Sequence, residues 1–327
     1  MPTRLLVAVA TLLTLAAPLT AEEAHVALNP YRVDVAESLP AGARLDRIRL
    51  RGMLVLPSVT VAGMRFSQLS ALAWDDDDEV LYALSDKGYL FHLKPEFRND
   101  TLVGLALLKA YTLTDPKTGK PLRRPDTEGM DILNGRNGRK GDAELLISFE
   151  RQPRVVRYRP DGTALAELSL PPPLTDVKAY RSDNLMLESV CVDPVLGILV
   201  APEEPLVTDT VGTRIFSLSG KSWRYPHTAG FGITAMECLG DGRVLVMERT
   251  FGLMRRAVSL KLVQLPEKPT DQILSTTPVV TLDAGYGHRV DNFEGLARHK
   301  DKRFFIVSDD NDLFVQQTLL LYFELLE

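Results

Sequence analysis

The chain has 327 residues, 45% of them hydrophobic and 25% charged, which is an ordinary globular composition with enough apolar side chains for a core. The net charge of −5 argues against a nucleic-acid partner, because binding to phosphates needs a basic field. The length would allow two domains, but closed all-β folds of this size often form one, and we expect a single domain over residues 44–327.

Residues 1–21 have the pattern of a signal peptide. Arg4 supplies the positive start, residues 5–17 are apolar but too short to span a bilayer, and Ala21 ends a small-residue cleavage pattern. We therefore expect a monomer that is periplasmic or secreted after cleavage near Ala21. We expect no membrane anchor, because no cysteine lies near that point and no later segment is long and apolar enough to cross a membrane.

The segment after the signal peptide is expected to close the fold. Residues 22–43 contain three Pro or Gly residues and predict an extended lead-in, whereas residues 44–56 alternate charged and apolar side chains like a half-buried strand. This strand belongs to no complete repeat, and the last repeat lacks an obvious fourth strand. We predict that strand 44–56 joins the last blade and closes a ring, which removes an exposed sheet edge.

From residue 66 onward one pattern occurs five times: a strand that opens on a polar residue, a turn, a strand that ends in an acid, and a third strand. The repeats start near residues 66, 125, 184, 231 and 291. Fourth strands are predicted at 104–113, 163–170 and 278–285, with a weaker candidate at 221–227. Such repetition is typical of an all-β propeller, here with five blades. The alternatives are a sixth, degenerate blade built partly from residues 22–66, or a two-sheet sandwich.

Two positions of the repeat carry the candidate chemistry. The residues that open the first strands are Ser70, Glu128, Glu188, Thr234 and Glu294. Those that end the second strands are Asp86, Glu150, Glu203, Glu248 and Asp309. Equivalent positions of a propeller converge on one axis, so the pattern predicts a ring of carboxylates. Such a ring is suited to a hard cation, and the alternative is a set of carboxylates that tie the blades together through backbone amides.

We divide this predicted ring into two halves. The expected metal ligands are Glu128, Glu188, Glu203, Glu294, Asp309 and Asp310, with Glu204 beside them. Three bases follow acids on the other half and are expected to bind an anionic substrate: Lys87, Arg151 and Arg249. The alternative for these side chains is solvated strand ends with local ion pairs. The candidate catalytic residues are Glu294, Asp309 and His288, the last as a general acid or base.

The two cysteines, Cys191 and Cys238, fall on the first strands of neighbouring repeats. An oxidising compartment permits a disulfide between them. They lie one position out of register, so their side chains should point to opposite faces of their sheets. We therefore expect two small buried hydrophobic residues rather than a bonded pair.

Several segments, taken together and in this order, resemble one known family. They are SALAW with LYALSDKG, DTEGMDIL with LLISFER, GITAME with DGRVLVMER, and DNFEGLA with FFIVSDDN and TLLLYFEL. They are similar to the phytase-like β-propeller domain described as "esterase-like activity of phytase", over most of the chain from Phe66 to Leu326. The resemblance implies an exported propeller that hydrolyses phosphate or other esters, with calcium as the expected cofactor. The matching positions are Asp86, Glu128, Glu150, Glu188, Glu248, Glu294, Asp309 and Asp310.

Two functions from different classes follow. The first is a calcium-dependent esterase or phosphoesterase that acts on a small phosphorylated or esterified substrate. The second is a non-catalytic periplasmic propeller that binds a ligand or a partner protein. The sequence contains no G-x-S-x-G elbow and no P-loop, so serine-hydrolase and nucleotide-motor chemistry lack support.

Overall fold

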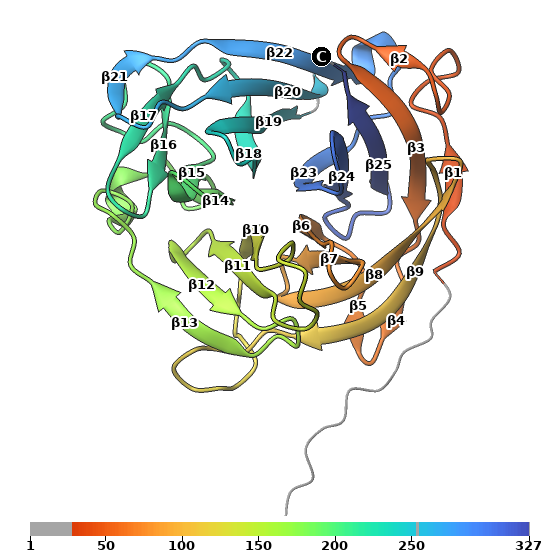
Figure 1. Ribbon diagram of the computed structural model, residues 1–327, viewed down its shortest axis with the longest axis horizontal. Helices are drawn as coiled ribbons and strands as arrows, with labels where there is room; N and C mark the ends of the chain where they lie inside the picture. Colours follow the sequence, from red (N-terminus) through yellow and green to blue (C-terminus); the bar gives the residue numbers. More distant parts are fainter. Residues whose placement is uncertain (1–27, 253–254, 327) are drawn as a thin grey trace, which may run out of the picture.

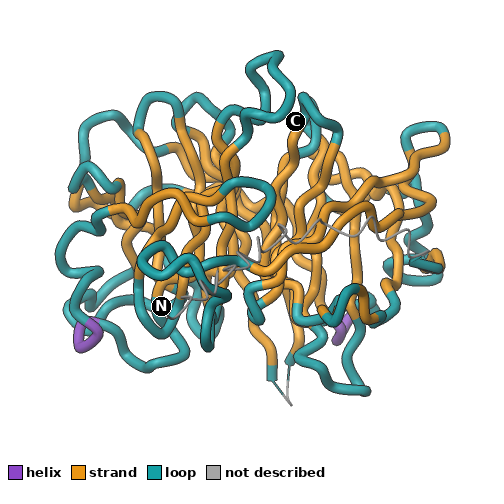
Figure 2. The backbone as a smooth tube through the Cα atoms, turned by 90° about the horizontal axis from the view of Figure 1, so that it is seen from below, coloured by secondary structure: helices purple, strands orange, loops and turns teal. Residues whose placement is uncertain are grey.

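The computed structural model describes residues 28–252 and 255–326, and the predicted signal peptide lies outside them. Five sheets, antiparallel except for one edge strand, surround a central axis like the blades of a propeller (Figure 1). The five-bladed all-β fold predicted from the repeats is confirmed. Seen from the side, strands fill the middle of the molecule and most loops lie at its two faces (Figure 2). Among the described residues, no helix is long and apolar enough to cross a membrane.

Four blades follow one another along the chain, each with its innermost strand first. Blade 1 consists of β6 (Leu69–Asp75), β7 (Val80–Ser85), β8 (Tyr89–Arg98) and β9 (Thr101–Thr112). Blade 2 consists of β10 (Thr127–Leu133), β11 (Glu144–Phe149), β12 (Arg154–Tyr158) and β13 (Ala164–Leu168). Blade 3 consists of β14 (Leu187–Asp193), β15 (Gly197–Pro202), β16 (Thr213–Ser217), β17 (Ser222–Tyr225) and the parallel edge strand β21 (Thr270–Ile273). Blade 4 consists of β18 (Gly232–Cys238), β19 (Arg243–Phe251), β20 (Arg256–Gln264) and β22 (Thr276–Asp283).

Blade 5 combines both ends of the described chain. Its strands are β23 (Asn292–Arg298), β24 (Arg303–Asp309), β25 (Thr318–Leu325), β3 (Ile48–Leu56) and β1 (Tyr31–Val33), with β2 (Arg44–Leu45) paired to β3. Strand β3 runs antiparallel to β25, with Leu319 opposite Val55 and Leu325 opposite Ile48. The predicted closure is confirmed. The small hairpin of β4 (Thr60–Val61) and β5 (Met64–Arg65) and the short 3-10 turns η1 (Val177–Ala179) and η2 (Ala284–Tyr286) complete the fold.

The core is divided into five apolar clusters, one between each pair of neighbouring blades. Between blades 4 and 5, for example, Leu245 and Leu260 pack in the same cluster as Phe293 and Phe304. Similar clusters lie between blades 5 and 1, 1 and 2, 2 and 3, and 3 and 4. Both faces of each sheet are therefore covered, and successive residues of a strand pack against different neighbours.

The two cysteines form a disulfide between blades 3 and 4, so the expectation of an unbonded pair is wrong. Cys191 on β14 and Cys238 on β18 have their Cα atoms 5.5 Å apart, a usual spacing for bonded cysteines. The one-position offset does point the side chains to opposite faces of equivalent sheets. In a propeller, however, opposite faces of neighbouring sheets meet, and the offset therefore brings the two sulfur atoms together.

Candidate functional site

Every innermost strand has a β-bulge at the same place, and the bulge positions the candidate site. The pairing register shifts between Leu69 and Ala71, Thr127 and Met130, Leu187 and Ser189, Ile233 and Ala235, and Phe293 and Gly295. The residues at these shifts are Ser70, Glu128, Glu188, Thr234 and Glu294, which are the predicted strand-opening residues. A bulge redirects a side chain, so a polar residue can occur here in strands that are otherwise apolar.

Small residues after the bulge let neighbouring blades approach. A Cβ atom at Gly129 would lie 2.5 Å from the Glu188 carbonyl oxygen, and one at Gly295 would lie 3.0 Å from the Ala71 backbone. Where glutamate is replaced, hydroxyl groups join the blades: Ser70 donates to the Thr127 carbonyl at 2.8 Å, and Thr234 to the Phe293 carbonyl at 3.3 Å. The ring therefore combines carboxylates with direct contacts between blades.

The second ring position contains four acids and one arginine, which corrects the sequence alignment in blade 4. On the second strand of each blade, one residue pairs with the last residue before the bulge of the first strand, and the ring residue comes directly after it. These ring residues are Asp86, Glu150, Glu203, Arg249 and Asp309. Glu248 pairs with Ile233 and lies one residue before this position. Its carboxylate is fully buried and forms a 2.6 Å ion pair with Lys261. Glu248 therefore belongs to the interior of blade 4 and not to the ring.

Six carboxylates of the two positions, together with Asp126, gather into three overlapping groups. In each group, one ligand atom from every side chain lies within 4.8 Å of the others. The groups are Asp86 with Glu128 and Glu294, Asp126 with Glu128 and Glu150, and Glu150 with Glu188 and Glu203. Since Glu128 and Glu150 each belong to two groups, seven carboxylates from blades 5, 1, 2 and 3 form one connected arc.

Arg249 lies at the blade 4 end of this arc and pairs with its acids. Its Nη2 is 2.9 Å from Glu294 Oε1 and 3.6 Å from Glu203 Oε1. The same guanidinium donates through Nη1 to Asn292 Oδ1, and the Asn292 amide donates to Glu294 Oε1 at 2.7 Å. Arg249, Asn292 and Glu294 therefore form a fixed network, and the guanidinium is oriented by carboxylates rather than free to bind a substrate anion.

Burial and mutual repulsion raise the pKa values of these acids. The pKa values of Asp86, Glu128, Glu188 and Glu294 lie well above their usual range, first because the charged forms are buried and then because neighbouring carboxylates repel. Burial also raises the pKa of Glu150 to about 7 and that of Asp309 to about 6. Without another cation, the arc must therefore hold protons at neutral pH.

The structure separates the two remaining acids predicted as metal ligands from the three groups. Asp309 Oδ1 accepts a hydrogen bond from the Asn311 backbone at 2.7 Å. The charge of Asp309 also raises the pKa of Asp86. Asp310 accepts from the Gln68 backbone at 3.0 Å and from the Thr318 hydroxyl at 2.9 Å. Asp310 thus joins blade 5 to the start of blade 1.

The other predicted site residues lie outside the arc. Lys87 Nζ lies 3.4 Å from Asp312, and Arg151 Nε lies 3.0 Å from Asp126, with both basic side chains at least half exposed. His288 lies on the turn after β22, where its Nδ1 accepts a hydrogen bond from the Asp283 backbone at 3.1 Å. The imidazole therefore stabilises that turn.

Asp126 is a candidate ligand that the sequence pattern did not indicate. It lies two residues before Glu128, just as Asn292 lies two residues before Glu294. A polar residue two positions before the bulge glutamate was the available signal, although Asp126 itself lies just before β10. A second missed feature is a basic cavity of about 640 Å³ lined by Lys117, Lys120, Arg123, Arg124 and Arg154, among others. Two of its lining residues, Arg124 and Gln152, lie close in sequence to Asp126 and Arg151.

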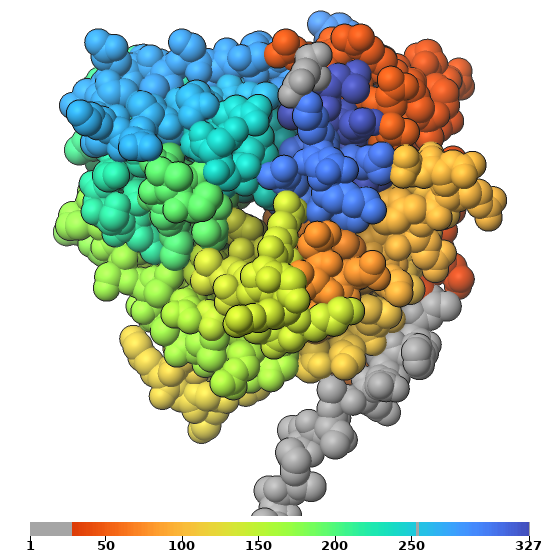
Figure 3. All heavy atoms as spheres, viewed as in Figure 1, coloured from red at the N-terminus to blue at the C-terminus, as the bar shows by residue number. Residues whose placement is uncertain are grey.

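The opposite opening of the channel has a different chemistry. Residues 134–142 lie across it (yellow-green in Figure 3), and Arg136 Nη2 donates to the Arg298 and His299 carbonyls at 2.6 and 3.0 Å. A cavity of about 350 Å³ beside this contact is lined by Asp131 and Glu237 among other residues. Each acid accepts a backbone hydrogen bond from the next blade, Asp131 from Val192 and Glu237 from Arg298. These acids connect blades.

Two solved propellers align with this chain at low similarity. The Cps50 (Swd1) β-propeller domain of Myceliophteria thermophila is 10% identical with a TM-score of 0.41, and the alignment covers 91% of this chain and 98% of that one. The RRP9 WD40 repeats are 9% identical with a TM-score of 0.39, and the alignment covers 90% of this chain and 86% of that one. The DNA-directed RNA polymerase subunit beta' of Thermotoga petrophila is 31% identical over 137 residues, which is 36% of this chain but 8% of that subunit.

A family model covers far more of the chain than any of these sequence relatives. The family is the phytase-like family described as "esterase-like activity of phytase", and its model matches residues 64–312. The matched residues run from β5 to just beyond β24 and contain all seven carboxylates of the arc. The chain therefore belongs to the phytase-like family described as esterase-like activity of phytase.

Proposed function

We propose that the protein is an exported, calcium-dependent hydrolase that acts on a small phosphorylated or esterified molecule. One observation carries the proposal. Seven clustered carboxylates form three overlapping groups that could each hold a metal ion, and the buried Arg249 pairs with two of these carboxylates. Family membership supports ester hydrolysis as the chemistry. Export, calcium and a monomeric state are expectations from the sequence that this proposal keeps, and cell fractionation with detection of the processed N-terminus tests the first of these.

The residues present fit a hard cation. All members of the three groups are carboxylates, and calcium prefers six to eight oxygen ligands held by flexible acidic side chains. Asp86 Oδ1 is buried and has no hydrogen-bond partner among the described residues, so it is available as a ligand. A cation shared by Asp86, Glu128 and Glu294 would also relieve the repulsion that raises their pKa values.

The chain's own groups would divide the remaining work. Bound calcium would supply polarisation of the ester and a lowered pKa for a coordinated water. Arg249 and Asn292 hold Glu294 Oε1 in one orientation. Asp309, with its pKa raised to about 6, can accept a proton at its carboxylate and release it near neutral pH.

The basic cavity whose lining residue Arg154 interacts electrostatically with Asp126 of the arc supports an anionic substrate. Five of its lining side chains are basic, whereas its acids are Asp115 and Glu167. Asp115 already accepts hydrogen bonds from the Lys117 and Thr118 backbone at 3.0 and 2.8 Å, which leaves it occupied within its own loop. A phosphate or carboxylate of the substrate could therefore bind this cavity while its ester group lies at the arc.

The experiment measures release of phosphate from phytate and from an aryl phosphate, and release of nitrophenol from a nitrophenyl ester, with added calcium or with chelator. Turnover that chelator abolishes and calcium restores is the expected result. Calcium binding without turnover of any ester would favour the alternative, a binding propeller with a structural ion. Equal turnover with and without chelator would contradict a metal-dependent mechanism.

A further inference from the structure

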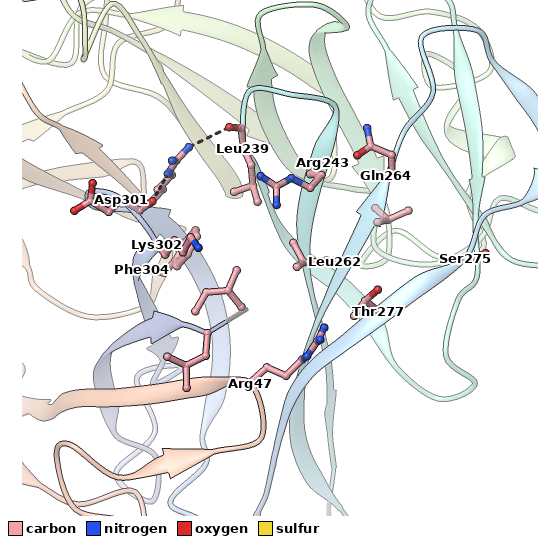
Figure 4. Close-up of a pocket in the computed structure, with 14 residues that line it drawn as sticks. Arg47, Leu239, Arg243, Leu262, Gln264, Ser275, Thr277, Asp301, Lys302 and Phe304 are labelled. Atoms are coloured by element: carbon pink, nitrogen blue, oxygen red, sulfur yellow. Dashed lines mark hydrogen bonds between the residues drawn. The ribbon is translucent and has the colours of Figure 1, made fainter.

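A second cleft lies on the outer part of the molecule, between blades 4 and 5. Figure 4 shows its fourteen lining residues, which come from the start of β3, the β18–β19 turn, strands β20 and β22, the β23–β24 turn and the end of β25. Its volume is about 550 Å³, within the usual range for sites that bind small organic molecules. None of the carboxylates of the arc lines this cleft.

The floor of the cleft is apolar. Leu239, Leu262, Val263, Phe304, Leu325 and Leu326 contribute to it. Val263, Phe304 and Leu325 are buried, and Leu262 packs against the cluster between blades 4 and 5. The floor is therefore held in place by the core, and an apolar group bound there would be removed from water without rearranging the blades.

The rim of the cleft is basic. Four of the fourteen residues are cationic, Arg47, Arg243, Arg298 and Lys302, and one is acidic, Asp301, whose carboxylate is directed away from the cleft in Figure 4. Arg243 is already paired with Asp241 at 2.8 Å, so the anion site depends on Arg47 and Arg298. Arg298 donates through Nε and Nη1 to the carbonyls of Asp301 and Leu239 at 2.9 and 3.1 Å, so two neutral groups orient it. Burial and then the charge of Arg136 lower the pKa of Arg298, and the charges of Glu237 and Asp241 offset this only in part.

Arg47 completes the rim from the other side. Its backbone is fixed, because its N–H donates to the Val279 carbonyl at 3.0 Å and its carbonyl accepts from Leu326 at 2.7 Å. Its exposed guanidinium makes no hydrogen bond or ion pair with any described residue. An Arg held at a fixed point over an apolar floor is suited to a planar oxyanion, which it can bind through two N–H groups.

We propose that this cleft binds an organic anion with an apolar body, the class that includes aryl sulfonates and medium-chain fatty acids. The apolar part occupies the floor, and the anionic head lies against Arg47 and Arg298. The site is independent of the proposed hydrolase site, because the arc is strongly acidic and would repel the same ligand in the absence of a metal.

The test uses anilinonaphthalene sulfonate, an aromatic sulfonate that fluoresces on entering an apolar site. We expect saturable binding to the folded protein, displacement by decanoate, and far weaker displacement by decanol, which has no charge. Arg47→Glu should weaken affinity about tenfold, because it replaces an attractive contact with a repulsive one. Arg32→Glu is the matched control: it makes the same charge change on exposed β1 of the same blade, outside the cleft, and should leave affinity within about twofold.

A second variant tests the cleft without altering charge. Thr277 is exposed on β22 and lines the cleft, so Thr277→Trp should fill it without disturbing the core and should abolish saturable binding. Unchanged circular dichroism and melting temperature establish that each variant is folded. The proposal is overturned if Arg47→Glu and Thr277→Trp both bind the probe like wild type, or if decanol displaces it as well as decanoate does.

Discussion

Arg249 Nη2 lies 2.9 Å from Glu294 Oε1, and this contact joins blade 4 to blade 5 at the end of the carboxylate arc. Arg249 occupies the ring position that is acidic in the other four blades. It is therefore an internal counter-charge for a cluster that otherwise repels itself. Two cations can therefore neutralise these carboxylates: the arginine of the chain and a metal ion from solution.

Replacing Arg249 with glutamine should destabilise the metal-free protein and increase its response to calcium. Breaking a buried ion pair by removing one partner costs about 3–5 kcal/mol, because the remaining carboxylates lose their counter-charge. Calcium should restore more stability to Arg249→Gln than to wild type. Urea unfolding with calcium and with chelator measures both effects. Lys87→Gln is the control, because its 50% exposed side chain forms a solvent-screened pair with Asp312, outside the arc, that is worth less than about 1 kcal/mol.

Glutamine substitutions should separate the three carboxylate groups by calorimetry. Glu128→Gln affects two groups at once, whereas Glu188→Gln affects one, so Glu128→Gln should reduce calcium stoichiometry or affinity more. We expect a loss of at least about tenfold in affinity for Glu128→Gln, since each removed charge weakens a hard-cation site. Glu237→Gln is a matched control, because it makes the same substitution at a half-buried acid whose pKa is also raised, at the other channel opening, and it should leave calcium binding unchanged. Equal effects from all three substitutions would contradict a site at the arc.

The raised pKa values predict how stability depends on pH. Burial raises the pKa of Glu150 from 4.5 to about 7, so the folded protein binds more protons than the unfolded chain between these values. The free energy of unfolding of metal-free protein should therefore fall as pH rises through this window. We expect the melting temperature to drop by about 5 °C in chelator. Calcium should reduce or reverse the trend, because it replaces the protons. A melting temperature in chelator that rises over the same window would contradict this account.

The disulfide between Cys191 and Cys238 should contribute measurably to stability. It joins the innermost strands of two blades across 47 residues of chain, and such a link typically contributes about 2–4 kcal/mol. Cys191→Ala with Cys238→Ala should lower the free energy of unfolding by that amount, and reductant should have the same effect on wild type. Reductant should leave the double variant unchanged, which is the internal control. A wild-type protein that is insensitive to reductant during unfolding would contradict the pairing.

The fold could be predicted because the repeats are visible in the sequence itself. Each repeat has the same order of strands, and the strand at 48–56 lacks a repeat of its own while the last blade lacks a partner for β25. An unpaired sheet edge is open to pairing with another strand, so counting the strands predicts that the N-terminal strand pairs with the last blade and closes the ring. The disulfide could not be found in this way, since the relation between faces of neighbouring blades depends on the completed ring.

The site could be predicted only in part, because a bulge adds one residue without leaving a clear mark in sequence. LLISFER and VLVMER look equivalent, with Glu150 and Arg151 matching Glu248 and Arg249. In blade 2 the residue before the bulge, Thr127, pairs with Phe149, so Glu150 takes the ring position. In blade 4 the residue before the bulge pairs with Glu248, so Arg249 takes that place. A shift of one residue on a strand exchanges the two faces.

This one-residue shift makes a prediction that separates the two glutamates. Glu248→Gln should lower stability by about 3–5 kcal/mol, because Lys261 would remain buried without its counter-charge. It should leave calcium affinity within about twofold, because Glu248 lies outside the three groups. Glu150→Gln should have the opposite profile: weaker calcium binding, with metal-free stability kept or increased because a repelling charge is removed. Paired calorimetry and urea unfolding measure both quantities, and a loss of calcium binding in Glu248→Gln would show that the register assigned to blade 4 is wrong.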